Sequence, residues 1–112
     1  MMSANQTVAA LAALAQEHRL QAFRFLVQRG ADGAPAGMIA DHLAIPASSL
    51  SFHVAQLERA GLVTRTRKSR SLIYPANFAA MNTLVGYLME NCCGLAVACA
   101  PAADRQNERN AA

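Results

Sequence analysis

The sequence predicts a mainly α protein with one small β-hairpin. Apolar residues recur at helical spacing in four segments before residue 61 and in one segment after residue 77. Between them, residues 62–74 alternate and are rich in β-branched side chains, which indicates two strands. The 112 residues, 54% of them hydrophobic, suffice for one domain with a modest core. We therefore expect a domain over residues 1–100 and a disordered polar tail over residues 101–112.

Two helices open the chain. Residues 7–16 predict a short amphipathic helix, and residues 18–29 predict a longer one that ends at Gly30, a residue suited to a C-terminal cap. The side chains expected to face the core are Val8, Leu11 and Ala15 with Leu14 beside them, and then Leu20, Phe23 and Val27 flanked by Phe25 and Leu26.

A loop and two further helices follow. Glycine and proline make residues 31–37 a loop, and residues 38–43 predict a short third helix. Pro46 either stops that helix or opens the next one, which covers residues 47–60. Apolar residues at spacings of four and three define the core face of this fourth helix, with an aromatic residue expected at the edge: Leu50, Val54 and Leu57, with Phe52.

The hairpin and a last helix complete the domain. Residues 62–67 predict one strand and residues 70–74 the return strand, with a turn at Lys68 and Ser69. Asn77 is suited to cap a last helix over residues 78–92. This helix has a wide apolar stripe, which in so small a chain favours packing against a second subunit: Phe78, Met81, Leu84, Val85, Leu88 and Met89.

The order of these elements is that of a winged helix-turn-helix. The short third helix would brace the fourth, whose small polar side chains let it lie deep in the major groove of DNA. Cations on the hairpin, or wing, would neutralise phosphates. The candidate DNA-binding residues are Ser48, Ser49, Ser51, His53 and Gln56 on the helix, and Arg65, Arg67, Lys68 and Arg70 on the hairpin. The net charge of +3 suits a polyanionic partner such as double-stranded operator DNA.

Each of these features has a plainer interpretation. A serine-rich helix face is often only solvated surface, and a basic hairpin is often a charged edge that prevents aggregation. His53 is as well suited to a hydrogen-bonded brace as to a DNA contact. A winged helix that binds proteins and never touches DNA is a further alternative.

Residues 49–63 resemble the recognition-helix signature of the ArsR/SmtB metalloregulators. That signature has Ser-x-His-Leu, then Leu, then Ala-Gly-Leu-Val, and here these places hold Ser51, His53, Val54, Leu57 and residues 60–63. Residues 17–26 are similar to the second helix of the family, and the resemblance extends over about residues 8–92. It implies a homodimeric winged-helix repressor that a metal or metalloid releases from DNA. The chain departs from the family at Val54, where Leu is usual, and in a wing turn without glycine.

The three cysteines all lie within residues 92–99. A secreted disulfide framework would spread an even number of cysteines along the chain. Cys92, Cys93 and Cys99 are close enough to converge on one ion, and trivalent arsenic prefers three sulfurs in a trigonal pyramid, as does Sb(III), whereas zinc prefers a fourth ligand. The pattern also resembles arsenite repressors with a C-terminal site. We therefore expect As(III) or Sb(III) as inducer.

Other roles for these thiols stay open. They are suited to burial as small hydrophobes or to a redox switch through a disulfide from Cys99, and methylated As(III) is an alternative ligand. No grouping indicates an enzyme, because thiols at a helix C-terminus are poorly placed as nucleophiles. The alanine-rich N-terminus lacks the early cations of a signal peptide, and no apolar run is long enough to span a membrane. The sequence thus predicts a cytoplasmic protein.

Overall fold

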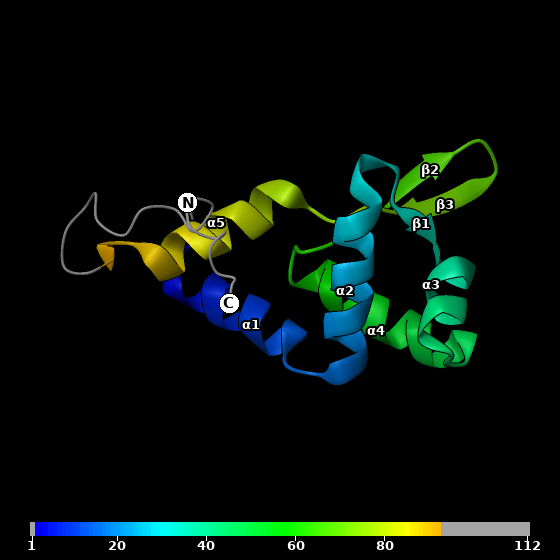
Figure 1. The fold of residues 1–112 in the computed structure, drawn as a ribbon, viewed down its shortest axis with the longest axis horizontal. Helices are drawn as coiled ribbons and strands as arrows, with labels where there is room; N and C mark the ends of the chain where they lie inside the picture. The colour runs from blue at the N-terminus through cyan, green and yellow to red at the C-terminus, as the bar shows by residue number, and fades with distance from the viewer. Residues whose placement is uncertain (1, 93–112) are drawn as a thin grey trace, which may run out of the picture.

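The computed structural model describes residues 2–92, which form five α-helices and a three-stranded antiparallel sheet (Figure 1). The elements, in chain order, are α1 (Ala4–Leu14), α2 (Glu17–Arg29), the 3-10 turn η1 (Gly30–Asp32), β1 (Ala34–Pro35), α3 (Ala36–Leu43), α4 (Ala47–Arg59), β2 (Thr66–Lys68), β3 (Ser71–Tyr74) and α5 (Phe78–Met89). Figure 1 shows α3 and the sheet at one end of the long axis, while α5 runs beside α1 toward the other. Within residues 2–92, no helix combines the length and the apolar character that a membrane crossing requires.

The core lies where α2, α3 and α4 meet. Leu50, Val54 and Leu57 are buried along one face of α4, which confirms the predicted core face. Leu26 of α2 and Ile39 of α3 are fully buried against the same cluster. Because large aliphatic side chains hold α4 from behind, its opposite face is presented to solvent as a fixed surface.

The predicted inner face of α1 is wrong. The buried residues of this helix are Thr7, Ala10 and Ala13, whereas Val8 is 65% exposed and Leu11 is also exposed. Small side chains let α1 approach α2 and α4 closely, so the larger apolar residues point away from the core.

Two other predictions of core residues also fail. Leu20 of α2 is exposed, because Ala22, Phe23 and Leu26 form the buried face of that helix. Phe52 of α4 is 59% exposed and does not pack at the edge of the core.

The sheet starts later than predicted and has one more strand. Leu62 and Val63 are buried core residues with a single bridge from Val63 to Ala76, so β2 begins only at residue 66. The turn falls at residues 69 and 70, and Ser69 there has φ +55°. The expected loop over 31–37 contributes β1, which pairs with β3 to give the order β1-β3-β2. Pro35 is compatible with this place because β1 is an edge strand.

A glycine closes the junction between this short strand and the end of β3. Gly33 has φ +57°, and a Cβ atom there would lie 2.7 Å from the backbone nitrogen of Pro75. Any side chain would therefore push β1 away from the stem of the hairpin.

The ends of the helices show which sequence signals were sufficient to predict helix boundaries. Gly30 caps α2 with φ +71°, and the Asn77 side chain caps α5, as predicted. Ser3 and Gln6 form a capping box that starts α1 at residue 4, earlier than the prediction from apolar periodicity. α5 ends at Met89, so Cys92 lies just beyond it rather than in its last turn. Cys93, Cys99 and the predicted tail lie outside the described residues.

Candidate nucleic-acid interface

The solvent face of α4 is centred on Ser48, Phe52, Ala55 and Arg59, which are all exposed. At about 3.6 residues per turn, these four positions point roughly opposite to Leu50, Val54 and Leu57. Three of the four side chains on this face are small or apolar, and Ser51 is exposed on its flank. A helix with such a face can enter a major groove without steric obstruction.

The N-terminus of α4 is free to accept an anion. Pro46 is the N-cap and provides no side-chain hydrogen bond, and the first helical backbone bond runs from Leu50 N to Pro46 O at 3.0 Å. Ala47, Ser48 and Ser49 are exposed there. Backbone amides and the helix dipole at this end favour a phosphate oxygen, and the serine hydroxyls can add hydrogen bonds to it.

Gln56 lies on a different flank from the one the sequence suggested. It is half-buried and lines a surface pocket of about 300 Å³ together with Arg19, Arg59 and alanines of α1. Arg19 is held in place by a 2.7 Å hydrogen bond from its Nε to the carbonyl oxygen of Ala13. Gln56 therefore lies on the side of α4 that faces the α1–α2 corner, off the centre of the outer face.

His53 is wedged between α4 and α2. Its ring centroid lies 5.5 Å from that of His18 and 5.7 Å from that of Phe52, and its Nδ1 atom is buried without a hydrogen-bond partner among the described residues. Burial lowers the pKa of His53, and the nearby charges of Arg19 and His18 lower the same pKa further. A neutral His53 held by ring contacts acts as a packing brace for α4.

The basic hairpin is tied to α4 by one ion pair. Arg65 donates from Nε to Oε2 of Glu58 at 3.1 Å and from Nη2 to Oε1 at 3.0 Å. This hydrogen bonding to Glu58 raises the pKa of Arg65. Arg67, Lys68 and Arg70 are exposed further along the hairpin, so the hairpin presents three cations while the fourth is engaged at its base.

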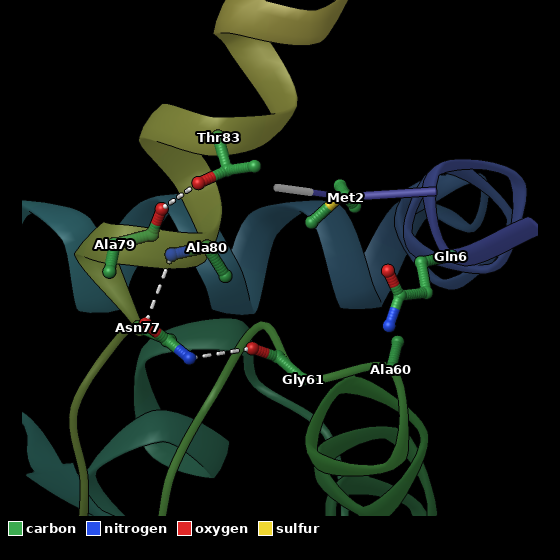
Figure 2. A pocket seen from close by; sticks show the side chains of 8 residues that line it. All are labelled: Met2, Gln6, Ala60, Gly61, Asn77, Ala79, Ala80 and Thr83. Atoms are coloured by element: carbon green, nitrogen blue, oxygen red, sulfur yellow. Dashed lines mark hydrogen bonds between the residues drawn. The ribbon is translucent and has the colours of Figure 1, made fainter. Parts of the chain in front are cut away.

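Asn77 joins the end of α4 to the start of α5. Its Nδ2 donates to the carbonyl oxygen of Gly61 at 3.0 Å, while its Oδ1 accepts from Ala80 N at 3.1 Å (Figure 2). Its backbone N–H donates to the carbonyl oxygen of Leu62 at 2.8 Å. Figure 2 places these groups at one side of a pocket of about 340 Å³, with Gln6 of α1 and Met2, which precedes that helix, at the other side.

The structure thus brings the three serines, the start of α4 and the basic hairpin to the surface. Phe52 and Arg59, which the sequence analysis did not assign to the interface, stand at the centre of the outer face. The signal that would have found them is simple. The residues farthest around the helix from Leu50, Val54 and Leu57 are those at positions 52 and 59.

The predicted metalloid ligands are only partly within the described residues. Cys92 is half-buried beyond the end of α5. Residues 2–92 contain no cluster of three or more histidine, cysteine or carboxylate side chains that could hold a metal ion.

Comparisons with known proteins agree with this arrangement. Residues 14–66 match the model of a helix-turn-helix domain. A comparison with curated protein sequences finds no significant match.

Several solved structures share the fold. An ArsR-like transcriptional regulator from Rhodococcus sp. RHA1 has a TM-score of 0.69 at 23% identity, covering 80% of this chain and 81% of that one. A homodimeric winged helix-turn-helix DNA-binding domain from Mycobacterium bovis, a possible ArsR-family regulator, has a TM-score of 0.61 at 23% identity, covering 78% and 81%. The transcriptional regulator HlyU from Vibrio vulnificus CMCP6 is 31% identical over 72% of this chain and 84% of its own, with a TM-score of 0.52.

The proteins from Rhodococcus and Vibrio are transcriptional regulators, and the one from Mycobacterium is a possible one. The 31% identity to HlyU over most of its length goes beyond a shared fold, and the order of helices, outer face and basic hairpin is the same as the sequence resemblance implied. The chain belongs to the same family of helix-turn-helix transcriptional regulators as HlyU, and it shares the winged-helix fold of ArsR-like regulators.

Proposed function

We propose that this regulator is a homodimeric repressor of an arsenic-resistance operon in the cytoplasm, released from its operator when As(III) or Sb(III) binds Cys92, Cys93 and Cys99. The observation that carries the DNA-binding part is the ion pair between Glu58 and Arg65. It fixes the basic hairpin relative to α4, so that one rigid unit offers a groove-sized helix face and phosphate-binding cations.

Exposed apolar side chains support the dimer. Val8 and Leu11 on α1, and Val85, Leu88 and Met89 on α5, are all exposed, although α1 and α5 pack against each other (Figure 1). Exposed apolar side chains of this kind mark interfaces, and α5, which carries three of them, extends toward the end of the molecule away from α3 and the sheet. A second copy joined there would leave both α4 helices free for two half-sites.

The chemistry of the cysteines supports the inducer. Trivalent arsenic exchanges each As–OH bond for an As–S bond with a thiol, and one water is released for each bond formed. Three cysteines within eight residues supply the three sulfurs without a change of oxidation state. Cys92 follows α5 by only a few residues, so ligand binding there acts on the helix that we place in the dimer interface.

The test starts from duplexes selected out of a random pool by the full-length protein. We expect a preferred sequence, and under reducing conditions arsenite should weaken binding to it by roughly 10-fold or more, a coupling within the usual range. A triple Cys→Ser variant should keep wild-type affinity and lose the response.

Three other results would contradict parts of the proposal. Absence of any preferred duplex would contradict operator binding. An arsenite response retained by the triple variant would contradict the cysteine site. A third result is that arsenite has no effect and a mild oxidant releases the DNA. If mass spectrometry then shows a disulfide, the protein responds to thiol oxidation and not to a metalloid.

A further inference from the structure

The largest side chain at the centre of the outer face of α4 is a phenylalanine. Phe52 is 59% exposed, although a phenyl ring gains free energy when it is removed from water. Its ring contact within the described residues is with the edge of His53, at 5.7 Å between centroids. The fold therefore leaves most of this ring uncovered on the surface that the helix presents to a groove.

The surroundings of Phe52 suit one kind of partner. Its neighbours one turn away on the same face are Ser48 and Ala55, which are too short to shield the ring. The hairpin beyond Arg65 and the free N-terminus of α4 supply positive potential on either side, which attracts a polyanion and repels basic surfaces. An apolar ring framed by phosphate-binding groups fits the floor of a DNA major groove.

Only one apolar group projects into the major groove of DNA from the four standard bases. It is the 5-methyl group of thymine, and phenylalanine is among the side chains that contact it. We propose that Phe52 is a specificity-determining residue that covers a thymine methyl group in each half-site. This inference rests on the proposed DNA binding and adds the base that the recognition helix selects.

The orientation of the ring supports a selective contact. Phe52 has few rotatable bonds, and its T-shaped contact with His53 restricts them further. His53 is itself wedged against His18 of α2. The ring is thus held by packed neighbours. Because the side chain cannot simply rotate, it cannot compensate for a methyl group that is displaced or missing.

The experiment replaces single thymines by uracil in a duplex selected from a random pool by the wild-type chain. Uracil keeps every hydrogen-bonding group of thymine and lacks only the methyl group. Wild-type protein should bind about fourfold more weakly for each methyl that the ring covers. Phe52→Ala should bind thymine and uracil duplexes equally at those positions, and Phe52→Leu should keep part of the preference.

A matched control is Leu20→Ala. It removes an exposed apolar side chain that lies on α2 instead of α4, and it should keep the wild-type preference for thymine. Equal melting temperatures would show that the variants are folded. The inference is overturned if wild-type protein tolerates uracil at every position, or if Phe52→Ala keeps the same preference. It is also overturned if Phe52→Ala changes only the oligomeric state. Failure to select any duplex would instead contradict the proposed function.

Discussion

Glu58 and Arg65 form a two-bond ion pair that joins the last turn of α4 to the base of the hairpin. Both side chains are accessible, with 54% of the Arg65 side chain exposed, so the pair fixes geometry more than it stabilises the fold. The cations of the hairpin therefore have two different roles. Arg65 is held for positioning, while Arg67, Lys68 and Arg70 are available to phosphates.

These two roles predict that substitutions in the hairpin change the salt dependence of DNA binding to different extents. Replacing Arg67, Lys68 or Arg70 by Ala should reduce the slope of log affinity against log salt by about one unit for each phosphate that is no longer neutralised. Arg65→Ala should weaken binding with little change of slope, and Glu58→Gln, which frees Arg65, should steepen it. Anisotropy titrations at several salt concentrations measure this. Equal slopes for all five variants would contradict the phosphate contacts.

His53 predicts a pH-dependent stability. Its folded pKa lies below the ordinary value of 6.5, so the unfolded chain takes up a proton at a higher pH than the folded one. The free energy of unfolding should therefore fall as the pH drops below about 6.5 and level off once the folded histidine is also protonated. His53→Gln should flatten this part of the urea-unfolding profile. His42→Gln, on α3, is the control for simple loss of an imidazole.

The exposed face of α5 predicts a monomeric variant. Leu88 is 58% exposed, and Leu88→Glu would place a charge in the middle of the proposed interface. Sedimentation should show a dimer for the wild type and a monomer for the variant, with weaker operator binding because only one half-site is held. Leu20→Glu changes an exposed leucine of α2 and should stay dimeric. If the Leu88→Glu variant is still a dimer, the dimer interface does not include this face of α5.

The cysteines predict a difference between two ligands. Methylarsenite offers only two exchangeable positions, so Cys92 and Cys93 suffice to hold it. Cys99→Ser should lose release by arsenite and keep release by methylarsenite, whereas Cys92→Ser and Cys93→Ser should weaken both responses. Release of labelled operator by each ligand under reducing conditions measures this. Wild-type release of Cys92→Ser by arsenite would exclude the cluster as the sensor.

Local signals were sufficient to predict most of the fold. The three-and-four spacing of Leu50, Val54 and Leu57 determines the core face of α4, and Gly30 and Asn77 cap the helices where the sequence places them. The failures arise where packing decides between similar patterns. The buried face of α1 is formed by alanines and not by Val8 and Leu11, because helices that pack closely favour small residues. The spacing of hydrophobic residues does not reveal this preference.

The exposure of the serines and of the basic hairpin residues could be predicted from the helical spacing and the charge pattern, and their contacts with DNA stay a prediction. The pairing of Glu58 with Arg65 joins residues seven apart across a turn, and the pairing of β1 with β3 spans about forty residues, so neither follows from local sequence. Phe52 is apolar and so favours an interpretation as a core residue, although its position on the helix directs it outward.

The bond from Asn77 to Gly61 anchors the start of α5 two residues beyond the end of α4, so that α5 can pivot about this point like a lever. The 12 residues of α5 span about 18 Å, so a tilt of roughly 10° about Asn77 would swing the far end by about 3 Å. Conversely, a small displacement of the far end of α5 would become a rotation at Gly61, just after the end of α4. In a symmetric pair the two levers would turn in opposite senses, so that modest local movements would sum to a change in the span between the two DNA-contacting faces.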